Sequence, residues 1–115
     1  MALTKANTIA LNAVTTTQTS SAVDVSASYG GEVYVKIVVV GTANTAANFS
    51  VLLSGDGTNY LSTIGPFSAG TAAATYNFPP IAYGIGCSSV EVSYTQQSGG
   101  TSSTATAHVS RVTAL

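Results

Sequence analysis

The sequence predicts an all-β chain: a single-domain, two-sheet β-sandwich with jelly-roll or Ig-like connections and about eight short strands. Apolar and polar residues alternate with a period of two in several runs, and no ten-residue window keeps a helical period. Gly, Pro, Asp and Asn gather between these runs, as they do in turns. The length of 115 residues is that of one ordinary domain.

The first two candidate strands are residues 9–14 and 23–28, where apolar side chains recur at every second position. The residues expected to face inward are Ile9, Leu11, Ala13, Val23, Val25 and Ala27. Residues 15–21, TTTQTSS, are polar and low in complexity, which predicts a loop or a hinge. We therefore expect an N-terminal arm over residues 1–22, with the first strand and the polar hinge. A sandwich body over residues 23–115 completes one domain overall.

The strongest candidate strand is residues 32–40. One face of this run carries Val33, Val35, Ile37 and Val39. The other face becomes apolar at Val38 and Val40, which predicts a central strand that is covered on both sides. The next run, residues 48–54, directs Phe49, Val51 and Leu53 inward.

The turn after this run is the most specific local signal. SGDGTNY, residues 54–60, contains Asp-Gly and an Asn that tolerate positive φ, and the Asp56 carboxylate can bond amides two residues on. This predicts a β-hairpin turn rather than a calcium loop, because Ca²⁺ needs several oxygen ligands and Asp56 is the only local carboxylate. The remaining strands are expected at residues 60–64, 74–78, 89–94 and 105–110.

Charged residues are scarce. Three Lys and Arg and four Asp and Glu make up 6% of the chain, against about 25% in ordinary soluble domains. Ser and Thr, 32 residues in all, must supply most of the polar surface. The net charge of −1 provides no basic field, so we expect no nucleic acid partner and no anionic membrane. Such a surface favours a homo-oligomer or a complex with another protein; the alternative is a monomer that hydroxyl groups keep in solution.

Sequence signals for export and for disulfide bonding are missing. The first twenty residues contain no apolar run of secretory length, and the longest apolar run, residues 37–40, is too short to span a bilayer. We therefore expect synthesis in a cytoplasm and no membrane partner. The single Cys excludes an intrachain disulfide framework and a multi-Cys metal site.

Few residues could support catalysis. Cys87 and His108 could form a thiolate–imidazolium pair, but no orienting carboxylate is identifiable, so a small buried Cys and an exposed strand His are the simpler interpretation. Residues 65–70, GPFSAG, are one residue too long for a nucleophile elbow and predict a loop. Residues 84–89, GIGCSS, lack the third Gly and the following helix of a dinucleotide fingerprint, which indicates a bend. We predict that the chain is not an enzyme and has no catalytic residue, cofactor or metal.

The aromatic residues fall into two groups. Those at alternating strand positions are expected to pack in the core or on a sheet face: Tyr34, Phe49, Tyr76, Phe78 and Tyr94. Tyr29, Tyr60 and Tyr83 flank turns and are the better candidates for an interface. A carbohydrate-binding or adhesion module that holds a sugar on these three tyrosines is the alternative from another functional class.

Three segments carry a resemblance: MALTKANTIALNA at the start, the Val-rich GEVYVKIVVVG, and the SGDGTNY turn. Together they resemble small virion structural proteins of tailed bacteriophages, most closely capsid decoration or cement proteins. The resemblance implies a small β-sandwich that binds the outer surface of the head, often as a homotrimer. It also implies the major capsid protein as partner and the capsid surface of the virion as location.

Composition and resemblance together predict a capsid decoration or cement protein that self-associates and stabilises the head by bridging neighbouring capsomers. Residues 2–14 and the polar hinge behind them are expected to take part, because an arm can become ordered on a neighbouring subunit. A neck, tail or head-fibre component of the virion is the alternative within the same class.

Overall fold

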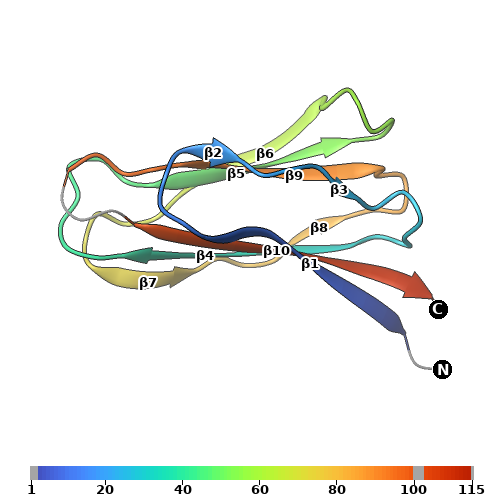
Figure 1. Ribbon diagram of the computed structural model, residues 1–115, viewed down its shortest axis with the longest axis horizontal. Helices are drawn as coiled ribbons and strands as arrows, with labels where there is room; N and C mark the ends of the chain where they lie inside the picture. The colour runs from blue at the N-terminus through green and yellow to red at the C-terminus, as the bar shows by residue number, and fades with distance from the viewer. Residues whose placement is uncertain (1–2, 100–102, 115) are drawn as a thin grey trace.

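The computed structural model describes residues 3–99 and 103–114, and this part of the chain is all-β (Figure 1). Its strands are β1 (Thr4–Val14), β2 (Gln18–Thr19), β3 (Val23–Asp24), β4 (Gly31–Val39), β5 (Asn48–Ser54), β6 (Ser62–Ser68), β7 (Ala74–Asn77), β8 (Ile81–Tyr83), β9 (Ser89–Thr95) and β10 (Thr104–Ala114). No helix of the described residues has the length and apolar character needed to cross a membrane.

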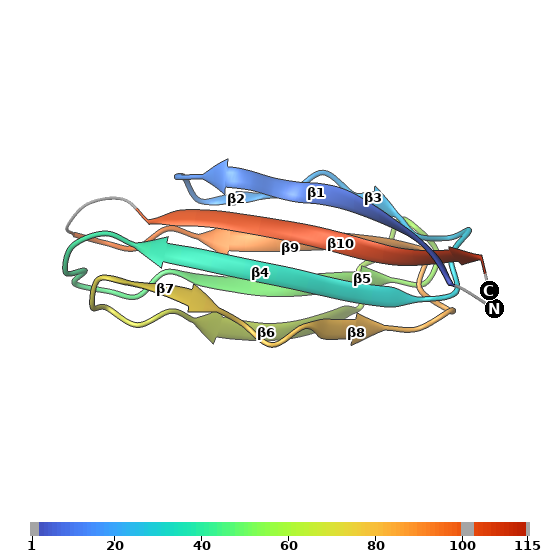
Figure 2. The same ribbon diagram turned by 90° about the horizontal axis from the view of Figure 1, so that it is seen from below.

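The strands form two five-stranded antiparallel sheets packed face to face, which confirms the predicted two-sheet sandwich. Sheet A has the order β1-β10-β4, and β4 then pairs with both β7 and β8 (Figure 2). In sheet B, β9 pairs with β5 on one side and with the short β2 and β3 on the other, while β6 completes the far edge. The last strand in the sequence therefore lies inside sheet A, between the first strand and β4.

The core lies between the sheets and consists mostly of alternating Val and Ala. The inward residues of β4, β5, β9 and β10 are almost completely buried: Val33, Val35, Ile37, Val39, Phe49, Val51, Val90, Val92, Tyr94, Ala105, Ala107 and Val109. The Phe49 ring lies at the centre of an aromatic group, with its centroid 5.3 Å from that of Phe67 and 4.8 Å from that of Phe78. The inward faces predicted for β4 and β5 are confirmed, except that Leu53 is only partly buried.

The outer face of β4 differs from the prediction of a strand covered on both sides. Tyr34 is 45% exposed and Val40, which follows the strand, is 49% exposed. Sheet B packs against one face of sheet A only, so the other face meets solvent even along its central strands. The two apolar residues of this outer face, Val38 and Val40, are therefore at least partly exposed to solvent.

The expected N-terminal arm contains a strand that is fully integrated into sheet A. Residues 4–14 pair with β10 from Thr4 opposite Ala114 to Val14 opposite Ala105. Residues 1–2 of the arm lie outside the described residues. The prediction that Ile9 and Leu11 share a face is wrong: Ile9 is 53% exposed and Leu11 is 1% exposed. A register shift between these two residues, typical of a β-bulge, reverses the alternation.

The second predicted strand, residues 23–28, is shorter in the structure, where β3 contains only Val23 and Asp24. The Asp24 carboxylate accepts hydrogen bonds from the amide and the hydroxyl of Ser26, at 2.9 and 2.6 Å, so the backbone turns after β3. Val25 nevertheless remains buried, as predicted.

The predicted loop at residues 65–70 is wrong in its first part, because β6 runs from Ser62 to Ser68 and pairs with β5. β6 therefore starts two residues later than the strand predicted at residues 60–64. Ten strands are observed in the described residues instead of about eight because β2 and β8, with two and three residues, have no counterpart among the predicted strands. Pairing with long neighbours, rather than a hydrophobic pattern of their own, defines these strands.

Candidate binding groove on sheet A

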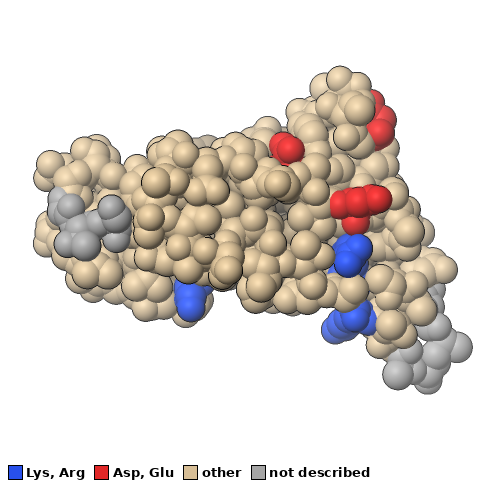
Figure 3. Space-filling view, viewed as in Figure 1, with Lys and Arg blue, Asp and Glu red and all other residues tan. Residues whose placement is uncertain are grey.

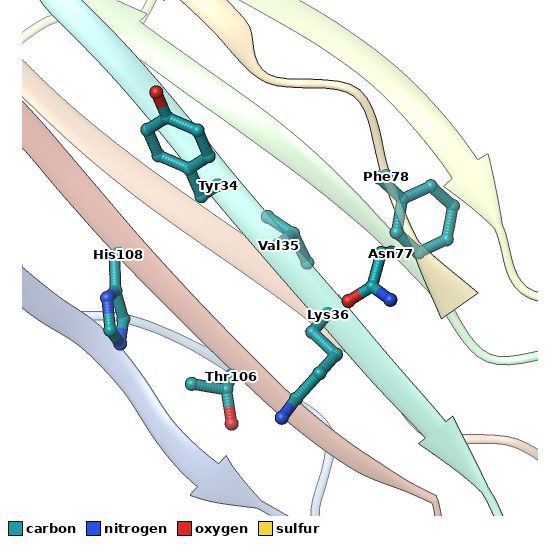
Figure 4. Close-up of a pocket in the computed structure, with 7 residues that line it drawn as sticks. All are labelled: Tyr34, Val35, Lys36, Asn77, Phe78, Thr106 and His108. Carbon is teal, nitrogen blue, oxygen red and sulfur yellow. The ribbon is translucent and has the colours of Figure 1, made fainter. Parts of the chain in front are cut away.

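A shallow groove of about 260 Å³ lies on the outer face of sheet A. Its lining residues are Tyr34, Val35, Lys36, Asn77, Phe78, Thr106 and His108 (Figure 4). They come from three neighbouring strands and the residue that follows β7. Register explains why they meet: His108 of β10 lies opposite Tyr34 of β4, and Lys36 lies between Thr106 of β10 and Asn77 of β7.

The groove forms where β4 lacks a continuous partner. β7 pairs with residues 36–39 of β4 and β8 with residues 31–33. Between them the chain contains Pro79 and Pro80, which have no amide hydrogen to continue a ladder. The Phe78 amide still donates to the carbonyl oxygen of Val35 at 3.1 Å, and the Phe78 ring packs edge-on against Phe49 in the core. The floor of the groove is therefore fixed by the core.

Hydrogen bonds orient two of the lining side chains. The Tyr34 hydroxyl donates to the Glu32 carboxylate at 2.7 Å, and this bond raises the pKa of Tyr34 above its usual value of 10.0. The side-chain nitrogen of Asn7 lies 3.0 Å from Nδ1 of His108. With the amide donating, the His108 proton resides on Nε2. Figure 4 shows the Lys36 side chain extending toward Thr106 along the groove.

This chemistry suits binding better than catalysis. The groove offers two aromatic rings, one ammonium group, an imidazole, an amide and two hydroxyl groups, but its lining has no Ser or Cys nucleophile beside a base. Across residues 3–99 and 103–114, no group of three or more His, Cys, Asp or Glu side chains is placed to hold a metal ion.

Cys87 and His108 are held by different neighbours. The Cys87 thiol lies in the β8–β9 loop, 3.3 Å from the carbonyl oxygen of Ser89 and 3.7 Å from that of Ser54. Both acceptors belong to sheet B strands, whereas the His108 ring contacts Asn7 on the outer face of sheet A. Cys87 is partly buried against the core rather than fully buried.

The Asp56 turn confirms the predicted hairpin between β5 and β6. One carboxylate oxygen of Asp56 accepts hydrogen bonds from the amides of Asn59 and Thr58, at 2.8 and 2.9 Å, and from the Ser54 hydroxyl at 2.9 Å. The second oxygen accepts from the Asn59 side chain at 2.7 Å. The bonds from Asn59 and Thr58 hold the pKa of Asp56 far below its usual value of 3.8.

The three turn-side tyrosines do not form one surface. Tyr29 is 50% exposed, and the partly buried Tyr60 hydroxyl lies 2.7 Å from that of Ser89. Tyr83 is buried, donates to the carbonyl oxygen of Ser110 at 2.6 Å, and has a pKa raised to about 12 by burial. Tyr83 is therefore a structural residue and not an interface candidate. The exposed aromatic of the groove is instead Tyr34, which the sequence pattern assigned to packing.

The sequence contains one signal for this groove. Consecutive prolines after an alternating run, at Pro79 and Pro80, predict an interrupted edge strand and an uncovered place on its neighbour. The order of strands in the sheet decides which side chains line the groove, and local sequence patterns do not predict that order.

Comparisons with known proteins relate the fold to one viral structure. No protein-family model matches the chain, and no curated protein matches it. Among solved structures, a chain from "Structure of infectious bursal disease virus Gx strain" aligns with a TM-score of 0.50 and 16% sequence identity. The alignment covers 94% of this chain and 29% of that chain, so this chain spans less than a third of the viral one. At this identity the likeness concerns the fold.

Proposed function

We propose that this protein is a structural component of a virus particle. The observation that carries the proposal is the fold match with a chain of the infectious bursal disease virus structure, which extends over 94% of this chain. The scarcity of charged side chains supports it, because surfaces that are covered by other subunits need little charge to prevent aggregation. In Figure 3 the charged atoms gather toward the end with the termini, and most of the remaining face is uncharged.

The specific role proposed is that of a capsid decoration or cement protein of a tailed bacteriophage, located on the capsid surface after synthesis in the host cytoplasm. Its partner in this proposal is the major capsid protein, and neither nucleic acid nor membrane is involved. A protein that binds only the assembled shell stabilises it by RT ln(1 + [L]/Kd) per site, which is about 2.7 kcal/mol at a concentration of 100 Kd. The resemblance implies a homotrimer, whereas the free strand edge described below favours a two-fold pair.

The direct test mixes the purified protein with capsids that lack it. Co-sedimentation to saturation at many copies per particle, together with a raised temperature of capsid disruption, supports decoration. Saturation at only a few copies supports a neck, tail or fibre role, and absence of co-sedimentation with any virion part refutes the proposal. Deletion of residues 2–14 is unsuitable here because it removes β1 and exposes β10. Surface substitutions are the better probe.

A second function, the binding of a saccharide, is favoured by the groove on sheet A. Tyr34 offers an exposed ring, and the polar groups of Lys36, Asn77 and His108 line the same groove. A glycan array tests this, with Tyr34→Ala expected to abolish any signal. Tyr29→Ala is the matched control, since Tyr29 is similarly exposed but does not line the groove. No signal on the array, or a signal that both variants retain, removes this candidate.

We propose no enzymatic activity. The two residues that could form a nucleophile and a base, Cys87 and His108, contact different sheets of the sandwich. A Cys87→Ala and His108→Ala double variant is expected to match the parent protein in capsid binding and in stability within about 1 kcal/mol. A loss of a measured turnover in this variant would contradict the proposal.

A further inference from the structure

The free edge of β1 differs from the other sheet edges of the sandwich. β1 has eleven residues and is the outermost strand of sheet A, with no strand of the described residues on its other side (Figure 2). The opposite edge of sheet A is interrupted at Pro79 and Pro80, and the β6 edge of sheet B contains Pro66. The remaining edge consists of β2 and β3, with two residues each. Prolines and short strands block the addition of a further strand, and among these edges β1 alone is long and free of proline.

The hydrogen bonds of β10 show how β1 is oriented. The Val112 amide donates to the carbonyl oxygen of Gly30 at 2.9 Å, and the Val112 carbonyl accepts from the Tyr29 amide at 2.8 Å, both on the β4 side. Successive residues of a strand direct their backbone groups to opposite sides. Arg111 therefore directs its amide and carbonyl toward β1, where its register partner is Ala6.

The same alternation along β1 identifies the groups at the free edge. Because Ala6 faces β10, the amides and carbonyls of Lys5, Asn7 and Ile9 point away from it. The side chains of these three residues are exposed, and that of Asn7 contacts His108 on the outer face of sheet A. Leu3, which precedes the strand, is exposed as well. Leu3 is 54% exposed and Ile9 is 53% exposed, so two large apolar side chains at this edge lie at the surface.

We propose that β1 pairs antiparallel with β1 of a second copy of this chain, around a two-fold axis at Asn7. Residues 5–9 keep an uninterrupted register with β10, and Asn7 is the centre of this regular segment. The axis places Lys5 opposite Ile9 of the second copy and Asn7 opposite Asn7. All outward amides and carbonyls of the segment then find partners, and sheet A continues across both copies.

The sequence of β1 makes the pair self-complementary. Lys5 is the only charged residue of the strand, and the axis keeps the two Lys5 side chains apart, each with its alkyl chain over Ile9 of the other copy. Ile9 also lies diagonally opposite Leu3 of the second copy, so Ile9 of each copy covers Leu3 of the other. The bulge after Ile9 limits the pairing to this segment. A second copy therefore satisfies the edge without help from another protein, and the inference does not depend on the virion role.

The test is the mass of the full-length protein by sedimentation equilibrium over a range of concentrations, with three variants. Ile9→Lys brings a second ammonium group opposite Lys5 at both ends of the pair, and it is expected to weaken dimerisation about tenfold. The double variant Lys5→Glu with Ile9→Lys places opposite charges there and is expected to restore the dimer. Asn7→Pro removes an outward amide and is expected to abolish pairing, while the fold is retained because that amide does not bond β10.

Leu61→Lys is the matched control, because Leu61 is 92% exposed and lies in sheet B's β5–β6 hairpin. Unfolding in urea confirms that each variant is folded. A dimer that Ile9→Lys weakens and the charge exchange restores supports the proposal. A monomer at every concentration overturns it, as does an oligomer that none of the β1 variants changes. Capsid binding by a monomer would refute this contact and leave the virion role intact.

Discussion

Replacing Phe49 with alanine tests whether the aromatic group at the centre of the sandwich carries a large part of its stability. Phe49 is completely buried in β5, with its ring centroid 5.3 Å from Phe67 of β6 and 4.8 Å from Phe78 after β7. Phe78 belongs to sheet A and Phe49 to sheet B, so this side chain joins the two layers. The substitution leaves a cavity that small neighbours such as Val and Ala cannot fill.

The expected loss of unfolding free energy is about 3–5 kcal/mol, the range for truncating a buried Phe. Edge-to-face and tilted ring pairs of this kind place the value in the upper part of that range, since each is worth about 0.5–1.5 kcal/mol beyond its buried area. Domains are stable by about 5–15 kcal/mol, so the variant is expected to be marginally folded. For a chain of this size the loss corresponds to a decrease in Tm of about 12–20 °C.

Equilibrium unfolding in urea, followed by tyrosine fluorescence, measures this loss. Leu61→Ala is the control: it also truncates a large apolar residue, but one that is 92% exposed, and it is expected to change stability by less than about 0.5 kcal/mol. A loss below about 1 kcal/mol for Phe49→Ala, or equal losses for the two variants, would refute the packing described for the centre of the sandwich.

Three further predictions concern backbone packing and pH. A Cβ atom on Gly31 would collide with a carbonyl oxygen of β10, so Gly31→Ala is expected to lose about 1–3 kcal/mol or more in urea unfolding, whereas Gly84→Ala, with open space around it, is not. The Asn59 amide is the main group that keeps the Asp56 carboxylate ionised, so this carboxylate stabilises the fold fully at pH values above its unfolded pKa of 3.8. The stabilisation is lost as the pH falls through the lower folded pKa. In Asp56→Asn, the urea midpoint is therefore expected to depend less on pH in acid. Tyr83 has a folded pKa of about 12 against 10.0, so stability is expected to fall between pH 10 and 12, less steeply in Tyr83→Phe.

Local patterns in the sequence predicted the layers of this fold well. The alternation in residues 32–40 identified the buried face of β4, because one sheet face must be apolar wherever a second sheet covers it. The Asp56 turn could be predicted because its hydrogen bonds are all local, from residues two or three positions away. Such features need no knowledge of the rest of the chain.

Features that depend on distant partners could not be predicted in this way. Nothing near Ile9 shows that Ala10 is an extra residue without a register partner in β10, so the bulge reversed the expected faces. Tyr83 resembled an exposed turn residue, and only its pairing with the distant Ser110 shows that it is buried. The groove has the same origin, since Tyr34 and His108 are 74 positions apart and meet only through the order of strands in sheet A.

The position of β10 has a consequence for how the protein forms. Among the strands of the sandwich β10 is synthesised after the others, yet it lies between β1, the earliest of them, and β4. Until residues 104–114 leave the ribosome, β1 has no neighbour in sheet A, so this sheet is completed only after β10 is made, by pairing strands that are far apart in the sequence. Slow folding of sheet A is the expected consequence of this strand order.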